Sequence, residues 1–402
     1  MERNLAVIAV YMILAANIPA TAASAAGANG LMQADPIKVL VARLDLDRYK
    51  STIKGLTRFG DRRQGTDRNR AAVAWIEAQL QSYGCSDISR LKYTYFPTDK
   101  LRPSGPPIVA GADRPVGGAR YRGVRARTGV NEDPLLQPDE KLRVLNSPPA
   151  QAGAREEVYC TKIGVAHPDE MYIVGAHMDG HGWGEAANDD GSGTALVMEL
   201  ARILCAPDVK TERSIRFVLW NNEETGLDGA WAYVKQRAAL QGKEEPAGSG
   251  RYPEPKWLGM IQHDMMLFDH GMPRADGSLA KKQRPEADVN IEFQSLARAA
   301  EGAQKLAWAF YSANESYAAD YPAAVGPHMT NTDSTPFMDL VPAISLRENE
   351  RGREIGAGWD PHWHQPSDVF AIYSDDDFRL GLNAAQTTLG AIGRLTGATL
   401  RH

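Results

Sequence analysis

Cysteine is scarce in this chain of 402 residues, which contains only 3 of them. Cys85, Cys160 and Cys205 lie far apart, and no pair has the Cys-x-x-Cys spacing. This pattern argues against a zinc-thiolate cluster and against a small fold built on a disulfide framework. In an oxidising compartment the three could form one bridge and leave one free thiol, and the sequence does not select the pair.

An excess of basic residues is also missing. The 45 lysine and arginine residues are balanced by 50 acidic residues, which gives a formal net charge of -5. The chain therefore lacks the electrostatic footprint of a nucleic-acid-binding protein, and no long basic or amphipathic run suggests a membrane surface. We expect small partners, and the sequence does not predict an oligomeric state.

The longest apolar run near the start, from Leu5 to Ile18, is shorter than the roughly 20 residues that cross a bilayer as a helix. Arg3 precedes this run, and a proline and small residues with Ala-x-Ala signals follow it. Residues 1–25 therefore read as a secretory signal peptide. We expect a protein exported to the periplasm or the exterior, with a mature chain that begins near Ala23 or Ala26.

Strand-like and helix-like segments alternate through the second half of the sequence. The segments "EVYCTKIG", "EMYIVGAH", "RSIRFVLW" and "KWLGMIQHD" predict strands, and helical patterns separate several of them. Strands separated by helices indicate crossover connections. The sequence thus predicts an α/β fold with a mixed, mostly parallel central sheet flanked by helices. A single amphipathic helix is expected over residues 36–59, and a final one from Asp375 to about Leu395.

Residues 101–155 interrupt this pattern with a stretch rich in proline, glycine and arginine. We interpret it as an insertion on the surface of one domain that spans residues 26–402. The arginines of this stretch could grip a substrate, but a solvated loop is the favoured reading. Six of them lie close together: Arg102, Arg114, Arg120, Arg122, Arg125 and Arg127.

Histidines and acidic residues follow the predicted strands at several places. One such stretch, "GAHMDGHGWGEAANDDGSG", lies between a predicted strand and a predicted helix. Because ligands of open α/β sheets bind beyond the carboxyl ends of the strands, we expect these side chains to converge. The residues are His177, Asp179, Asp189, Asp190, Glu223, Glu224, Asp264 and His364.

Converging carboxylates repel one another and raise each other's pKa unless cations are present. Histidine, aspartate and glutamate without cysteine form a ligand set that suits zinc, and also cobalt or manganese. Asp189, Glu224 and Asp264 supply negative charge that one divalent ion cannot match but two ions and a bridging hydroxide can. This balance predicts two Zn²⁺ per chain and hydrolysis of an amide bond.

The order of the motifs "HMD", "ANDDGSG", "NNEETGLDG", "QHDMM" and "HQPSD" resembles that of the two-zinc aminopeptidases of metallopeptidase family twenty-eight. The resemblance covers most of the chain after the signal peptide and is weakest over residues 101–155 and about 270–288. It implies the α/β/α sandwich of the zinc aminopeptidases and a single zinc peptidase domain over residues 26–402.

Carried over residue by residue, the resemblance implies that His177 and Asp264 bind one zinc ion. Glu224 and His364 would bind the other, and Asp189 would bridge the two. His362 lies close to His364, and the following "QPSD" selects His364 by the family pattern.

The resemblance also implies two roles outside the ligand set. Asp179 would orient His177 through the second ring nitrogen, and Glu223 would be the general base. In the family the peptide bond after the bridging aspartate, here Asp189–Asp190, is cis. The implied activity is hydrolysis of the N-terminal peptide bond of peptides through a metal-bridging hydroxide.

Some residues fit the family pattern less well. His181 and His263 neighbour proposed ligands, but we read them as incidental and leave them outside the metal set. Trp363 stands where many relatives have tyrosine, and Ser334 stands where histidine is usual. These departures affect how the oxyanion is held and which substrates are preferred.

Three rival functions remain open. A carboxypeptidase of the glutamate-carboxypeptidase type could use Arg347, Arg351 and Arg353 to bind a substrate carboxylate. A receptor-like homologue would keep the fold without catalysis, although every ligand position and the base are filled here. Glutaminyl cyclisation uses one zinc ion on this fold, and the retained His177 disfavours it.

Overall fold

The computed structural model describes six parts of the chain, all within one structural unit that spans residues 35–402. The predicted signal peptide lies outside the described residues, as do the six clustered arginines of the predicted insertion (Arg102 to Arg127) and Arg351 and Arg353. The described ranges are 35–96, 130–147, 152–269, 289–327, 332–348 and 360–401.

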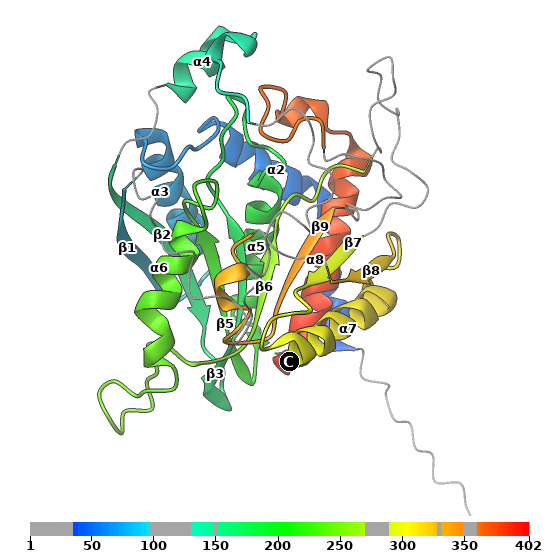
Figure 1. The fold of residues 1–402 in the computed structure, drawn as a ribbon. Helices are drawn as coiled ribbons and strands as arrows, with labels where there is room; N and C mark the ends of the chain where they lie inside the picture. Colours follow the sequence, from blue (N-terminus) through cyan, green and yellow to red (C-terminus); the bar gives the residue numbers. More distant parts are fainter. Residues whose placement is uncertain are drawn as a thin grey trace, which may run out of the picture. The chain divides into compact units, whose positions relative to one another are not determined.

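An eight-stranded sheet forms the centre of this unit (Figure 1). A second sheet pairs two short strands, β4 (Val209–Lys210) and β10 (Thr399–Leu400). In order across the large sheet, the strands are β1 (Asp87–Tyr95), β2 (Gly153–Lys162), β5 (Arg213–Trp220), β3 (His167–His177), β6 (Lys256–His263), β9 (Ala343–Glu348), β7 (Val289–Phe293) and β8 (Ala323–Gly326).

The middle of this sheet is parallel. Strands β5, β3, β6 and β9 pair in parallel, whereas β1, β2 and β7 join their inner neighbours antiparallel. The carboxyl ends of the four central strands therefore meet at one edge of the sheet. The predicted mixed, mostly parallel sheet is confirmed.

Helices cover both faces of the sheet (Figure 1). One face packs against α1, α2, α3, α5, α7 and α8, and the other against α6 and η3. The helices are α1 (Pro36–Val41), α2 (Leu46–Thr57), α3 (Asp67–Ser82), α4 (Glu140–Asn146), α5 (Gly191–Leu204), α6 (Asp228–Arg237), α7 (Ala300–Tyr317) and α8 (Asp375–Leu395), with 3-10 turns η1 (Pro134–Leu136), η2 (Ala238–Leu240), η3 (Thr335–Phe337) and η4 (Phe370–Ile372).

Strand β5 shows why its sequence produces a three-layer fold. Phe217 and Leu219 point to the core under α5, whereas Val218 and Trp220 point to the core under α6. All four side chains are fully buried. Successive side chains of a strand alternate between faces, so an uninterrupted apolar run is what a strand covered on both sides requires.

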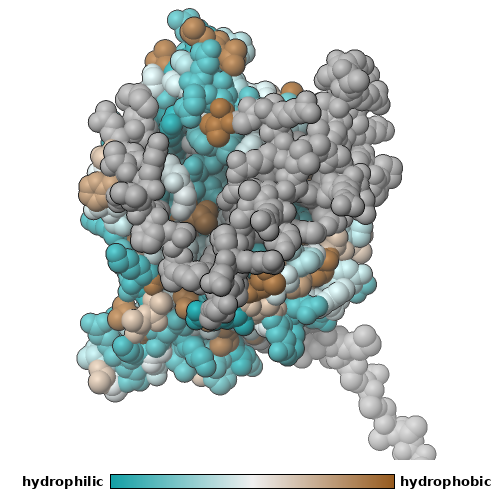
Figure 2. All heavy atoms as spheres, in the orientation of Figure 1, coloured by the Kyte–Doolittle hydropathy of each residue, from teal (hydrophilic) through white to brown (hydrophobic). Residues whose placement is uncertain are grey.

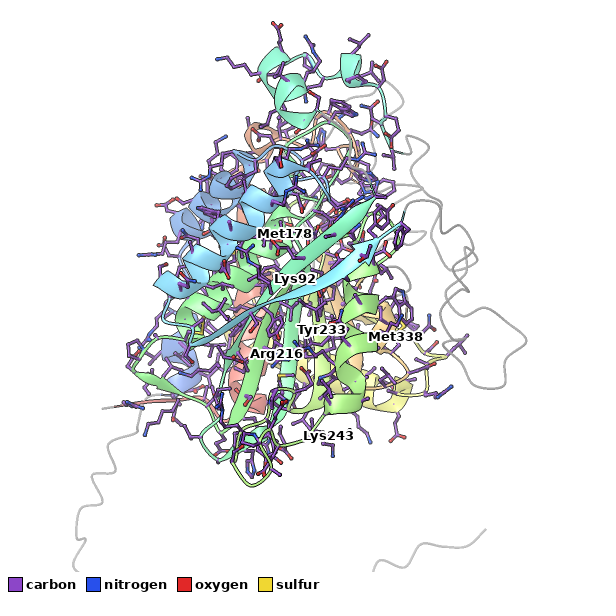
Figure 3. The ribbon with its side chains drawn as sticks, turned by 90° about the vertical axis from the view of Figure 1, so that its left-hand side faces the viewer. Lys92, Met178, Arg216, Tyr233, Lys243 and Met338 are labelled. Atoms are coloured by element: carbon purple, nitrogen blue, oxygen red, sulfur yellow. A yellow bond between two sulfur atoms is a disulfide. The ribbon has the colours of Figure 1, made fainter. Side chains whose placement is uncertain are left out.

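Helix α6 is held to the sheet by polar contacts as well as apolar ones. The buried Arg216 Nη1 on β5 donates to the Tyr233 hydroxyl on α6 at 2.6 Å, and both side chains contact Glu254. Figure 3 shows Arg216 and Tyr233 side by side, about midway between Met178 at one end of the sheet and Lys243 at the other.

Two local differences from the sequence-based expectation have clear causes. The helix expected over residues 36–59 is two helices, because the Asp45 side chain accepts a hydrogen bond from the Arg48 N–H and starts α2 anew. Strand β8 has four residues and only partial burial over most of its length, so it leaves little periodic signal in the sequence.

The described part of the predicted insertion is anchored to the loops at the carboxyl ends of the strands. The Asn131 N–H donates to the His364 carbonyl at 3.0 Å, and Gln137 Nε2 donates to the carbonyls of Trp183 and Pro366. The following β2 begins at Gly153, inside the range assigned to the insertion, and is an integral strand of the sheet.

Helix α4 and the turn before it carry exposed apolar side chains, which Figure 2 shows gathered at the top of the view. Leu135 and Val144 are 78% and 68% exposed. Figure 1 places α4 above the ends of the central strands.

A disulfide joins Cys85, just after α3, to Cys205 at the end of α5, with the two Cα atoms 5.3 Å apart. Cys160 on β2 is a buried free thiol. The bridge closes a loop of 120 residues, and constraining so long a loop in the unfolded chain contributes about 2–5 kcal/mol to stability. The pairing left open by the sequence is therefore Cys85 with Cys205.

Among the residues described here, none of the helices combines the length and the apolar character needed to span a bilayer.

Candidate active site

The candidate site lies at the carboxyl ends of the parallel strands. His177 ends β3, Glu223 and Glu224 follow β5, and Asp264 follows β6. His364 comes from the loop between β9 and α8. Met178, which follows His177, marks this end of the sheet in Figure 3. The structure brings these residues together, as the sequence predicts.

Asp189 lies between the two histidines. Its Oδ1 is 3.2 Å from His177 Nε2, and its Oδ2 is 2.9 Å from His364 Nε2. All three side chains are at least nine-tenths buried. One carboxylate thus presents a separate oxygen to each imidazole.

Two further carboxylates lie beside the histidines, one at each. Asp264 Oδ1 lies 3.8 Å from His177 Nε2, and Glu224 Oε2 lies 2.8 Å from His364 Nε2. The groups His177, Asp189 and Glu224, and His177, Glu223 and Asp264, each offer ligand atoms within 4.8 Å of one another. The donors are nitrogen and oxygen atoms, the set that zinc accepts alongside thiolates.

The carboxylates of the site raise the pKa of both histidines and so stabilise positive charge there. Burial lowers the pKa of His364, but Glu224 and Asp189 outweigh this effect and raise it to about 10. Burial likewise lowers the pKa of His177, and the neighbouring carboxylates, Glu223 first, raise it well above its usual range. The carboxylates thus favour positive charge at both imidazoles, which divalent ions would supply, so the residues fit a metal centre.

Unpartnered polar atoms point to the same fit. Among the described residues, Glu224 Oε1 is buried and has no hydrogen-bond partner. Buried polar atoms are nearly always satisfied by a protein group, a water or an ion. An ion at this position would satisfy the carboxylate.

Asp179 contacts His177 differently from the expectation. His177 Nδ1 lies 3.0 Å from the backbone carbonyl of Asp179 and 3.9 Å from its carboxylate. A protonated Nδ1 therefore donates to the carbonyl and leaves Nε2 to face the site. The Asp179 carboxylate instead accepts the Glu223 N–H at 3.2 Å, and so positions the loop that carries both glutamates.

Glu223 lies beside the group of His177 and Asp264. Burial raises its pKa well above the usual range for a glutamate, and the charge of Glu224 raises it further. A carboxylate with a raised pKa is a stronger base than an ordinary one, which is the property a proton shuttle near neutral pH needs.

Arg347, which could bind a substrate carboxylate in a carboxypeptidase, lies in a strand of the sheet. It lies in β9, is buried, and its Nη2 is 2.9 Å from Asp264 Oδ2 while its Nε is 3.6 Å from Glu292 Oε2. The guanidinium therefore holds the Asp264 oxygen that faces away from His177. The carboxylates that Arg347 contacts here, Asp264 and Glu292, are part of the protein and not of a substrate.

Asp190 and Asp368 hold the backbone around Asp189. Asp190 caps α5 by accepting a hydrogen bond from the Gly193 N–H, and it also accepts one from the His177 N–H at 3.2 Å. Asp368 accepts from the Asn188 and Asp189 N–H groups at 2.9 and 3.1 Å. The Asp189–Asp190 peptide bond is cis, as the family resemblance implies.

Arg62 is a further supporting residue, which sequence reasoning missed. Its fully buried guanidinium donates to the carbonyls of Met178, Glu185 and Ala186 at 2.7–2.8 Å, and so fixes both ends of the loop after β3. Its only signal in the sequence was its place within "LTRFGDRRQGTDRNRAAVAWI", where the family likeness begins.

The other histidines differ in their surroundings. His362 Nδ1 contacts the Ser367 hydroxyl at 2.8 Å, and His263 is fully buried between the Gly175 carbonyl and Thr388. Burial lowers the pKa of His263 to about 4. His181, however, lies at the site, with Nε2 3.0 Å from Glu224 Oε2.

The two departures from the family pattern differ in their surroundings. The Trp363 ring stacks on the His364 ring, with centroids 3.8 Å apart, so the indole limits the movement of that imidazole. Ser334 is fully buried just before η3.

Comparison with known proteins places these residues in a family. The sequence model of peptidase family M28 matches residues 159–386, more than half of the chain. Aminopeptidase YwaD of Bacillus subtilis is 41% identical over 70 residues, and Carboxypeptidase Q of Xenopus laevis is 33% identical over 73 residues. These matches cover 17% and 18% of this chain but only 15% and 16% of those proteins.

The similarity in fold extends over more of the chain than the similarity in sequence. The solved aminopeptidase from Aneurinibacillus sp. strain AM-1 superimposes with a TM-score of 0.55 at 18% identity. The match covers 91% of this chain and 96% of that one. At this identity the superposition shows the fold alone, whereas the family model covers every element that carries a site residue. The chain belongs to peptidase family M28.

Proposed function

We propose that this chain is an exported two-zinc aminopeptidase that hydrolyses the N-terminal peptide bond of peptides. The observation that carries the proposal is the position of Asp189, with one oxygen facing His177 and the other facing His364. His177, Asp264 and Asp189 would hold one zinc ion, and Glu224, His364 and Asp189 the other. Zinc supplies Lewis-acid polarisation of a carbonyl and lowers the pKa of water.

Glu223 would move the proton in this reaction. Its carboxylate lies beside His177 and Asp264, and the Asp179 carboxylate fixes its backbone N–H at 3.2 Å. Glu223 Oε would accept a proton from water and return it to the nitrogen of the leaving amine. The raised pKa of Glu223, caused first by burial, matches both halves of this transfer.

The charge of the site favours the amino end of a peptide. Glu223 is not among the proposed zinc ligands and adds a carboxylate beside His177 and Asp264, and such a group attracts a substrate ammonium and repels a carboxylate. Arg347, the described arginine considered for binding a C-terminal carboxylate, is buried against Asp264 and Glu292. The receptor-like and cyclase alternatives gain no support, because both ligand groups are complete.

Zinc content tests the ligand set. We expect two zinc ions per chain in the purified protein, and fewer in Glu224→Ala, because this variant removes the oxygen that lies 2.8 Å from His364 Nε2. The adjacent Glu223→Gln is the matched control and should keep both ions. Elemental analysis of the three proteins makes the measurement. Two ions in Glu224→Ala would remove Glu224 from the ligand set.

The choice of substrate end tests the activity. We expect the zinc-loaded protein to cleave aminoacyl-nitroanilides and free-amine peptides, and to spare the same peptides when they are N-acetylated. Cleavage of blocked peptides from a free C-terminus would instead identify a carboxypeptidase. Zinc binding without any turnover would favour a receptor-like protein.

The proton transfer tests the role of Glu223. Glu223→Gln keeps the shape of the side chain and loses the base, so kcat should fall by about 10²–10⁴-fold while zinc content stays unchanged. Steady-state kinetics on an aminoacyl-nitroanilide measure this loss. An unchanged kcat would assign the base to another residue.

Export is proposed from the signal-peptide pattern of residues 1–25, and the Cys85–Cys205 disulfide is consistent with an oxidising compartment. We expect the mature chain to begin near Ala23 or Ala26. The mass of the intact protein, recovered after expression of the full sequence in a Gram-negative host, reports its first residue. A chain that keeps Met1 in the cytoplasmic fraction would refute export.

A further inference from the structure

His181 lies against both protein groups assigned to the Glu224–His364 zinc position. Its Nε2 is 3.0 Å from Glu224 Oε2, and its ring centroid is 4.1 Å from that of His364, at an interplanar angle of 75°. His181, Glu224 and His364 each offer a ligand atom within 4.8 Å of the others. The family pattern assigns no role to this histidine.

The contact between His181 and Glu224 has the length of a hydrogen bond but not its geometry. Among the described residues, His181 Nε2 is buried and has no hydrogen-bond partner, and the same holds for Glu224 Oε1. In a tetrahedral zinc site with bonds of 2.0–2.1 Å, neighbouring ligand atoms lie about 3.3 Å apart. The separations of 3.0 Å and 2.8 Å that join His181, Glu224 and His364 are close to that spacing.

The backbone places His181 in this position. At Gly182 the loop after β3 approaches the His364 loop so closely that a Cβ atom would lie 2.3 Å from the His364 carbonyl carbon. Gly182 also has a φ of +93°, a conformation that favours glycine. Asn131 ties the two loops together, because its N–H donates to the His364 carbonyl and its Nδ2 to the Gly182 carbonyl.

A solvent-facing role does not fit these contacts. The His181 side chain is only 12% exposed, and its neighbours are the Glu224 carboxylate and the His364 ring. By contrast, His167 at the start of β3 is exposed and lies far along the strand from the site.

We infer that His181 is a fourth protein ligand of the zinc position formed by Glu224, His364 and Asp189. This inference rests on the proposed zinc centre and makes its two positions unequal. The His181 position would have two imidazoles and two carboxylates and would be filled by protein, as structural zinc sites are. The His177 position would have three protein ligands and would be the one open to water and substrate.

Chelator competition and cobalt spectroscopy on His181→Ala test the assignment, with His167→Ala as the matched control. In the wild-type protein one of the two zinc ions should resist a competing chelator more strongly than the other. In His181→Ala that ion should be bound at least about tenfold more weakly, and His167→Ala should behave as wild type. In the Co²⁺-substituted protein, His181→Ala should shift the visible bands of the cobalt ion in this position, because water would replace an imidazole nitrogen as its ligand.

The outcomes separate this inference from the proposed function. Unchanged zinc affinity together with an unchanged cobalt spectrum in His181→Ala would overturn the ligand assignment and leave the zinc peptidase intact. A wild-type protein that binds no zinc would refute the proposed function itself. Circular dichroism checks that the variants fold, and His181→Asn, which keeps a polar side chain, gives the same comparison should the alanine variant unfold.

Discussion

Electrostatic repulsion among buried carboxylates is the constraint on which the rest of this structure depends. Asp189, Glu224 and Asp264 are nearly buried, and each lies within 4 Å of one or both of the histidines His177 and His364. Such a group is stable only with compensating cations, whether protons on imidazole or divalent ions. The surrounding fold is arranged to enforce the approach: the parallel strands deliver the ligands to one edge, and α5 begins directly behind Asp189.

Three residues that are not proposed zinc ligands hold the loops and side chains of the site in place. Arg62 fixes the loop after β3 by binding its carbonyls, and Asp368 fixes the backbone of Asp189 by accepting its N–H. Arg347 balances the outer oxygen of Asp264. Removing Arg347 would take a cation away from the buried Asp264 carboxylate, whereas removing Arg62 or Asp368 would leave buried backbone groups without these hydrogen bonds. The precision of the site therefore depends on ion pairs and hydrogen bonds that lie outside the ligand set.

Sequence reasoning predicted the regular elements well and the contacts between loops poorly. β5 and α8 have the expected bounds because their apolar periodicities are long and uninterrupted. The break at Asp45 escaped notice because the apolar spacing continues across it. The sequence suggests Arg347 as a possible binder of a substrate carboxylate and gives His181 no role, because the partners of both residues lie on distant segments. Spacing along the chain reports which face a residue occupies, but not which loop from elsewhere in the fold packs against it.

The Cys85–Cys205 bridge determines what a single proteolytic cut does to the chain. This matters because we propose that the protein is exported to a compartment where proteases are present. The bridge encloses 120 residues of chain, which include the whole proline-, glycine- and arginine-rich stretch and the loop that carries Asp189. A protease that cut once within the enclosed segment would leave the two fragments covalently joined. A chain cut once between these two cysteines would thus remain a single molecule.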